Sequence, residues 1–374
     1  MTITATVRSP RFISGLTGMC MLVASCHAWS WGHTGHVEIS RIAIEKLPEE
    51  IPAFLRNDFA AATIGELGPE ADESKTTGVF TGVDPKFGIQ TTRTVHDQER
   101  DPGHFIDIED DGVVQGGKVC LSLTPTCLSL LPPTRELFDT AQRAGTPVQT
   151  QYKGYLPYEM IDGFQQLRKD FAMWRAFKVG LETSRKESDR KYFVTHLLLR
   201  EQLIIRDLGY WSHFVADASQ PMHVSVHFNG WQDFPNPSGF TQAPIHAPFE
   251  GAFVHDFIDF RKVAEAVRPY TDRGVSTNEA RVPLYLAETL SQVIPVYEAA
   301  LKSGKNGNDN YQNPEPLEVA IVTQQLAAGV AELRDEIVDA WKQSTQDVVG
   351  FPLVSVADIL AGRAVVTPTT FGAD

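Results

Sequence analysis

The segment 213–223 holds the densest group of side chains that are able to bind a metal. His213 and Asp217 are four residues apart, so they share one face if the segment is a helix. Pro221 ends such a helix and turns His223 toward the same region. Because imidazole nitrogens and carboxylate oxygens are the usual ligands of catalytic zinc, the segment predicts a metal site.

Other histidines and carboxylates enlarge this set beyond the needs of one ion. All eleven histidines lie between positions 27 and 255. His246 and Glu250 repeat the spacing of four, while His36 and His104 lie upstream. One such pair alone is more often structural than metal-binding, but three clusters in one chain favour a site for two or more ions.

The elements that must position these residues are mostly helices. Hydrophobic residues at spacings of three and four predict helices over 36–48, 157–186, 192–219, 281–303 and 315–345. The chain is therefore expected to be all-α, a multi-helical single domain.

Non-helical segments separate these helices. A loop-rich insertion is expected at about residues 66–135, which hold many Gly, Pro, Thr and Asp residues, with a hairpin around 105–122. Residues 228–248 predict a long loop, and a short helix is expected at 356–362.

Length and charge limit the function classes. The 374 residues suffice for one large helical domain over 31–350, with additional helices at 281–345 and a C-terminal tail at 351–374. A net charge of −14 argues against electrostatically driven binding to nucleic acid phosphates. It does not argue against an enzyme that handles phosphates, because metal ions supply positive charge locally.

The N-terminus has the layout of a secretory signal peptide over residues 1–30. Arg8 and Arg11 precede an apolar stretch, and small residues precede a cleavage point between Ser30 and Trp31. We therefore expect a secreted or periplasmic protein without a spanning helix. Residues 23–26, Val-Ala-Ser-Cys, also resemble a lipoprotein box, so a lipid anchor through Cys26 is the alternative.

Two cysteines remain after such a cleavage. Cys120 and Cys127 are separated by six residues, and in an oxidising compartment they predict one small-loop disulfide. Their spacing is not that of a zinc knuckle, so neither is a predicted ligand.

Taken together, these motifs resemble the superfamily that joins zinc-dependent phospholipase C to the single-strand-specific zinc nucleases. Residues 31–36, Trp-Gly-His-Thr-Gly-His, are similar to the nuclease N-terminus. The set His213, Asp217, Gln220, Pro221 and His223 is similar to the motif shared by both branches. The resemblance covers roughly residues 31–260 and implies an all-helical secreted phosphodiesterase with three zinc ions.

The resemblance also implies the ligands of each ion. The first ion would bind Asp72, His104, His213 and Asp217; the second Trp31, His36 and the bridging Asp217; the third His223, His246 and Glu250. Asp72 and Asp217 would be the catalytic carboxylates. Because the Trp-Ala-Asp sequence of the nucleases is absent here, Asp101 and Glu70 are alternatives to Asp72.

The chemistry of such a centre follows from the metal charge. Two close zinc ions acidify a shared water for attack on phosphorus, and the third stabilises the leaving oxygen. Each ligand imidazole also needs an acceptor on its other nitrogen, for which Asp107 and Glu109 are candidates.

Several nearby residues have simpler interpretations. His33 and His227 are off the spacing of the family, so a surface or supporting role is expected. Residues 107–112 faintly imitate a calcium loop, but Lys118 stands where a bidentate Glu is needed, so a turn is expected. Trp211 fits either the core or a substrate groove.

The preferred substrate is a phosphatidylcholine-like phospholipid, through phospholipase C activity and transient contact with a membrane surface. This preference depends on Glu250, on the missing carboxylate motif and on an aromatic loop expected to be exposed: Phe228, Trp231, Phe234 and Phe240. The alternative is a single-strand-specific endonuclease and 3′-nucleotidase, which the spacing of Trp31 and His36 favours. A non-catalytic exported zinc-binding protein is a third possibility. No obligate protein partner is evident.

Overall fold

The computed structural model describes residues 31–75, 95–121, 127, 130–143, 153–232, 234–273, 277–307 and 309–373. Within them the chain is predominantly helical, with one two-stranded sheet, so the all-α prediction is confirmed. None of the helices in these segments is long and apolar enough to cross a membrane. The expected signal peptide and Cys26 lie outside the described residues.

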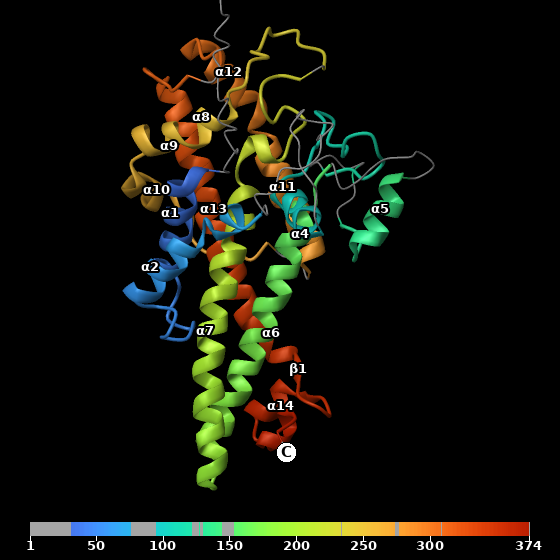
Figure 1. Ribbon diagram of the computed structural model, residues 1–374, viewed down its shortest axis with the longest axis vertical. Coiled ribbons are helices and arrows are strands. Elements are labelled where there is room, and N and C mark those ends of the chain that lie inside the picture. The colour runs from blue at the N-terminus through green and yellow to red at the C-terminus, as the bar shows by residue number, and fades with distance from the viewer. Residues whose placement is uncertain are drawn as a thin grey trace, which may run out of the picture.

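Two long helices lie at the centre of the packing of the other helices. Helices α6 (Leu156–Thr183) and α7 (Glu187–Asp217) pack side by side, and α14 (Val356–Leu360) packs against α6 near its lower end (Figure 1). They approach closely where Gly163 meets Trp211, since a Cβ at Gly163 would lie 1.8 Å from the indole. Trp211 is therefore a core residue, and its Nε1 donates a hydrogen bond to the Met160 carbonyl at 3.0 Å.

The remaining larger helices enclose the upper half of this pair. Helix α13 (Pro316–Gln343) packs on α1 (Gly32–Glu45), α6 and α7, and α2 (Asp58–Leu67) packs on α1 and α7. The predictions over 36–48, 157–186, 192–219 and 315–345 are thus confirmed, with α7 beginning five residues early.

The prediction of one helix over 281–303 was wrong. The structure has α11 (Asn278–Leu290) and α12 (Val293–Ser303), separated at Ser291 and Gln292. Pro295 has no amide hydrogen to donate to the carbonyl four residues before it, and its ring disfavours a continuous helix at that point.

Short helices occupy part of the segment that was expected to be irregular. They are α3 (Glu70–Glu73), α4 (Val95–Arg100) and the 3-10 helix η1 (Asp101–His104), and α5 (Arg135–Arg143) begins at the end of the segment. The first three have four to six residues, which is too few turns to show hydrophobic periodicity. The hairpin prediction corresponds to isolated antiparallel bridges, Ile108 to Val114 and Val113 to Cys120.

The remaining elements are short helices and strands, most of which lie between the long helices or at the C-terminal end. In the described part of the expected loop at 228–248, no helix comes before α8, which begins at His246. The elements are η3 (Pro221–His223), α8 (His246–Glu250), α9 (Ala252–Phe257), α10 (Phe260–Ala266), η4 (Ser344–Gln346), β1 (Val348–Val349), β2 (Val354–Ser355), α14 (Val356–Leu360) and η5 (Pro368–Phe371).

The aromatic loop is packed inward, contrary to the expectation that it is exposed. Trp231 and Phe240 are only 4% and 6% exposed, and Phe228 and Phe234 are half-buried. Trp231 stacks on His227 with ring centroids 3.6 Å apart and packs against Tyr297 on α12. Packing these rings against α12 removes apolar surface from water and so stabilises the fold more than leaving them exposed. The local sequence does not reveal this contact, because α12 lies far along the chain.

A buried ionic network joins α13 to α11. Arg281 on α11 donates to Glu332 at 2.7 Å and to Asp339 at 2.6 Å. Arg273 also donates to Glu332, at 2.9 Å. Glu336 lies 3.7 Å from the same Arg281 guanidinium. The three carboxylates of Glu332, Glu336 and Asp339 therefore share the charge of Arg281.

We predict that Glu336 makes stability fall as pH rises. Burial, together with the charges of Glu332 and Asp339, raises the pKa of Glu336 to about 8 although Arg281 lowers it. The pKa of Glu336 is higher in the folded than in the unfolded state, so its contribution to the free energy of unfolding is complete at low pH. That contribution is lost progressively as the pH rises to about 8. The expected slope is about 1.4 kcal/mol per pH unit. Urea unfolding at several pH values should show a flatter profile for Glu336→Gln; parallel profiles would contradict the prediction.

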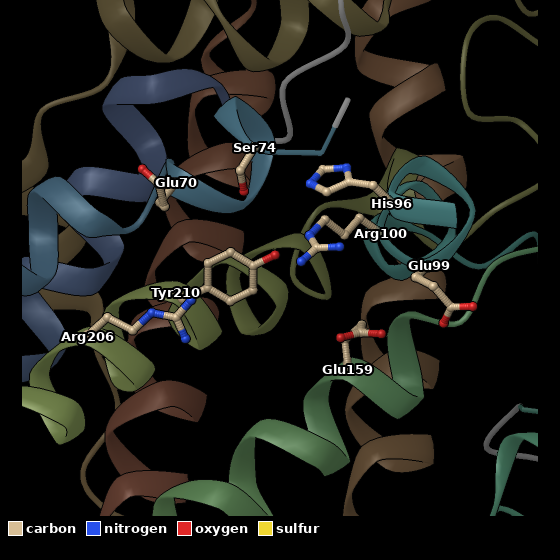
Figure 2. A pocket seen from close by; sticks show the side chains of 8 residues that line it. All are labelled: Glu70, Ser74, His96, Glu99, Arg100, Glu159, Arg206 and Tyr210. Atoms are coloured by element: carbon tan, nitrogen blue, oxygen red, sulfur yellow. The ribbon is translucent and has the colours of Figure 1, made fainter. Parts of the chain in front are cut away.

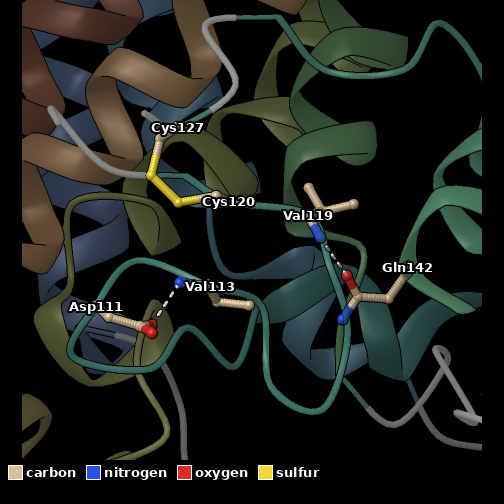
Figure 3. The surroundings of a disulfide bond; sticks show 6 residues. All are labelled: Asp111, Val113, Val119, Cys120, Cys127 and Gln142. Atoms are coloured by element: carbon tan, nitrogen blue, oxygen red, sulfur yellow. Dashed lines mark hydrogen bonds between the residues drawn. A yellow bond between two sulfur atoms is a disulfide. The ribbon is translucent and has the colours of Figure 1, made fainter. Parts of the chain in front are cut away.

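The predicted disulfide is present in the structure. Cys120 and Cys127 are bonded, with Cα atoms 5.0 Å apart (Figure 3). The same loop is held from the other side, since the Val119 amide donates to Gln142 on α5 at 3.0 Å. The Asp111 carboxylate accepts from the Val113 amide at 3.0 Å, so the calcium-like segment forms a turn, as predicted.

Removing this disulfide should lower the free energy of unfolding. A loop closed between residues seven apart contributes about 2 kcal/mol. We expect the double variant Cys120→Ser, Cys127→Ser to unfold at lower urea concentration than the wild type. A reducing agent should shift the wild type by the same amount and leave the double variant unchanged; an insensitive wild type would refute this.

Candidate metal centre

Four side chains from three separate elements converge in the buried interior. His104 Nδ1 lies 2.9 Å from His213 Nε2, and both lie near Asp217 Oδ2, at 3.2 and 3.3 Å. Asp72 Oδ1 completes the group, 3.5 Å from His104 Nδ1 and 3.7 Å from His213 Nε2. Among the three candidate carboxylates, Asp72 is thus the one that joins this group.

These distances match the donor set that zinc requires. Four ligands about 2.0–2.2 Å from one ion are about 3.3–3.6 Å apart at the corners of a tetrahedron. The five separations above lie between 2.9 and 3.7 Å. Two imidazole nitrogens and two carboxylates at such distances repel one another unless a cation or protons lie between them.

Backbone carbonyls orient two of the imidazoles. His213 Nδ1 donates to the Gly68 carbonyl at 2.9 Å, and His223 Nδ1 donates to the His104 carbonyl at 2.6 Å. Each bond leaves the Nε2 lone pair directed into the centre. For these two residues the acceptor is a backbone oxygen, and not Asp107 or Glu109. Backbone acceptors carry no signal in the sequence.

Asp217 lies between two groups of donors. Its Oδ2 faces His104 and His213, and its Oδ1 lies 3.4 Å from His36 Nε2. The His36 ring stacks on the His213 ring with centroids 3.9 Å apart. One carboxylate therefore contacts the donors predicted for the first ion and for the second.

Trp31 is held close to the same place. Its Nε1 donates to the Ser219 hydroxyl at 2.8 Å and to the Ala216 carbonyl at 3.1 Å, beside Asp217 at the end of α7. A Cβ on the next residue, Gly32, would lie 3.0 Å from the Glu250 carbonyl. The predicted role of the Trp31 amine depends on cleavage after Ser30, which lies outside the described residues.

A third group forms where η3 meets α8. His246 Nε2 lies 2.6 Å from Glu250 Oε2 and 3.1 Å from His223 Nε2. Gln220 Nε2 is 3.2 Å from His246 Nε2 and donates weakly to Glu250 at 3.4 Å. His223, His246 and Glu250 are all buried and can hold one ion together.

The carboxylates and imidazoles of the centre shift one another's pKa values. Burial opposes ionisation of Asp217 and Asp72, yet His213 and the other nearby cationic groups hold the pKa of Asp217 well below its usual range and lower that of Asp72 to about 2. Burial and Lys75 lower the pKa of His104 to about 4, and burial lowers that of His36, whereas Asp217 and Asp72 raise the pKa of His213 against burial. Ionised carboxylates and neutral imidazoles are the forms that bind metals, so a metal ion would take the place of the His213 proton.

Several donor atoms of the described centre have no hydrogen-bond partner although they are buried. Such atoms are costly unless something satisfies them. They are both ring nitrogens of His36, Asp72 Oδ2, His104 Nε2, both carboxylate oxygens of Asp217 and Glu250 Oε1. A set of ions bound among them would supply the missing partners.

Lys75 is a member of the centre that the sequence reasoning missed. Its Nζ lies 2.7 Å from Asp72 Oδ1, and Asp72 raises the pKa of this ammonium although burial opposes the charge. The only signal was its spacing of three from Asp72. Lys75 is therefore a permanent cation at the edge of the donor set.

The remaining candidates lie elsewhere. Glu70 is exposed, and so is His33 at the start of α1. His227 is buried, with its Nε2 3.1 Å from Asp110, and belongs to none of the three described groups that can hold an ion. Direct ligation is thus concentrated in the residues named above.

Comparison with known proteins adds no relative. Neither a protein-family model nor a curated protein matches the chain.

Proposed function

We propose that this protein is a zinc-dependent phosphodiesterase. The observation that carries the proposal is the presence of three buried groups of donors among the described residues, with Asp217 directing one oxygen toward His36 and the other toward His213. Structural zinc sites are closed sets of four protein ligands, whereas catalytic sites keep a position open. The third group has only three ligand side chains, which suits an open site.

The residues divide among three ions as the family resemblance implies. Asp72, His104, His213 and Asp217 would hold one ion, Trp31, His36 and Asp217 a second, and His223, His246 and Glu250 a third. When bound, the ions supply Lewis-acid charge for a phosphate and acidify water.

The chain itself contributes charge and orientation. Lys75 can donate to a non-bridging phosphate oxygen, because its ammonium is held at the edge of the donor set by Asp72. Asp72 Oδ2, which is buried without a hydrogen-bond partner, can accept a hydrogen bond from an attacking water and so orient it. The carbonyls of Gly68 and His104 keep the rings of His213 and His223 in place.

Two substrates fit such a centre. Phospholipase C activity on phosphatidylcholine-like lipids is supported by Glu250, which forms the His-x3-Glu pair of that branch by resemblance. Nuclease and 3′-nucleotidase activity is supported by residues 31–36 and by the burial of Trp231 and Phe240. With these rings packed inward, the loop offers less apolar surface for a lipid, so the nuclease gains support.

A side-by-side assay tests the proposal. Zinc-loaded protein beginning at Trp31 would be offered phosphatidylcholine vesicles, single-stranded DNA and bis(p-nitrophenyl) phosphate, each with and without EDTA. We expect turnover that EDTA abolishes and added zinc restores. Absence of turnover on all three, with zinc bound, would favour the non-catalytic zinc-binding protein.

A further inference from the structure

A polar cavity of about 480 Å³ is lined by residues of helices that also carry part of the candidate metal centre. Helices α3, α4, α6 and α7 each contribute to its wall (Figure 2). Its lining residues are Glu70, Ser74, His96, Glu99, Arg100, Glu159, Arg206 and Tyr210.

The same elements carry the cavity and the donor set. Ser74 follows Asp72 by two residues, and Tyr210 precedes His213 by three on the same face of α7. The Tyr210 ring lies 5.6 Å from the Phe214 ring, which in turn lies 5.3 Å from the His104 ring. The Phe214 ring, only 4% exposed, thus contacts both the Tyr210 ring at the cavity and the His104 ring at the centre, and one side chain links the two places.

Arg100 is the decisive residue of the cavity. Among the described residues it has neither an ion-pair nor a hydrogen-bond partner, although it is half-buried. Figure 2 shows its guanidinium directed toward Tyr210, with Arg206 on the opposite side of that ring. The Arg206 guanidinium lies 5.2 Å from the Tyr210 ring centroid and pairs with Asp207 outside the lining.

Part of the negative charge in the wall is already neutralised. Arg135 pairs with Glu159 and lies 3.9 Å from Glu99, so two of the three carboxylates have a cation outside the lining. Glu70 is exposed at the edge of the cavity. Arg100 is thus left to bind an anion that enters from solvent.

We infer that this cavity is a subsite for a second phosphate of the substrate, the phosphate next to the scissile one in an oligonucleotide. The inference rests on the proposed phosphodiesterase function. A guanidinium binds phosphate through paired N–H groups, and the half-buried Tyr210 ring offers an aromatic surface for a base. A phosphatidylcholine molecule has one phosphate and leaves Arg100 unused.

Binding measurements test the subsite independently of turnover. The probe is a fluorescein-labelled phosphorothioate oligothymidylate, titrated against zinc-loaded wild type and Arg100→Gln at several salt concentrations. We expect the Kd of Arg100→Gln to rise about tenfold and the salt slope to fall by about 0.7, the value for one phosphate contact on a single strand. Arg206→Gln should show a smaller change.

The control removes an equal charge elsewhere. Arg261→Gln, on α10, changes a side chain that is 88% exposed and should leave the Kd and the salt slope at their wild-type values. Circular dichroism checks that each variant is folded. Equal Kd values and salt slopes for Arg100→Gln and Arg261→Gln would overturn the subsite.

Turnover provides a second arm that separates the two proposals. Arg100→Gln should lower kcat/KM about tenfold for the trinucleotide TpTpT, mainly through KM, and leave bis(p-nitrophenyl) phosphate unaffected. A similar loss on phosphatidylcholine vesicles would overturn the oligonucleotide assignment. If the wild type hydrolyses nothing, the phosphodiesterase proposal fails, while the salt slope still decides whether the cavity binds phosphate.

Discussion

Asp217→Asn is expected to lower turnover by about 1000-fold or more, equivalent to about 4 kcal/mol of transition-state stabilisation. Asparagine keeps the size of the side chain but has one acceptor oxygen and no charge. In the structure both carboxylate oxygens are used, Oδ1 toward His36 and Oδ2 toward His104 and His213. The substitution therefore weakens metal binding both in the group that contains His36 and in the group that contains His104 and His213.

The metal content should change in parallel. On the proposed ligand sets, Asp217→Asn loses the first two ions and keeps the one held by His223, His246 and Glu250. Glu250→Gln should do the reverse and lose only the third. Metal analysis after gel filtration, with turnover on bis(p-nitrophenyl) phosphate, measures both effects.

A matched control uses the same substitution on the same helix. Asp189→Asn, at a half-buried position in the first turn of α7, should keep the metal content and turnover of the wild type. If Asp217→Asn also retained both, the bridging role of Asp217 would be wrong. Far-ultraviolet circular dichroism separates a lost site from a lost fold.

Arg281→Gln is expected to lower the free energy of unfolding by about 3–5 kcal/mol. Arg281 is buried on α11 and donates to Glu332 and Asp339 on α13. Removing its charge leaves buried carboxylates without their cation, and that penalty exceeds the net value of the ion pairs. Urea unfolding, with the slope against denaturant compared between variants, measures the loss.

Two further variants identify the cause. Arg363→Gln breaks an ion pair at a side chain that is 65% exposed and should cost less than about 1 kcal/mol. Adding Glu332→Gln to Arg281→Gln should recover part of the loss, because it removes one of the unpaired charges. A loss for Arg281→Gln no larger than that for Arg363→Gln would contradict this account.

This network also connects the C-terminal helices to the candidate centre. The Tyr285 hydroxyl on α11 donates to the Val215 carbonyl at 3.2 Å, and Gln325 on α13 donates to the Ser219 carbonyl at 2.9 Å. Both acceptors lie within two residues of Asp217. The helices beyond residue 277 thus cover and support the end of α7, a role that the sequence analysis left open.

The sequence alone determined the features that depend on near neighbours in the chain. Periodic apolar residues identified α6, α7 and α13, because a helical face repeats every three to four residues whatever it packs against. The same rule placed His213 and Asp217 on one face of α7. The pairing of Cys120 with Cys127 followed from the small number of cysteines.

Only the tertiary structure decided the features that join distant segments. Glu70, Asp72 and Asp101 are equivalent as residue types, and packing of the short helix α3 against α7 brings Asp72 to His213. The same packing supplied Lys75 at the centre and the Gly68 carbonyl behind His213. Helices of four to six residues and backbone acceptors have no periodic signature, and burial of Trp231 depends on α12, more than sixty residues later. Local spacing sets which side chains share a face, whereas the packing of whole helices sets which faces meet.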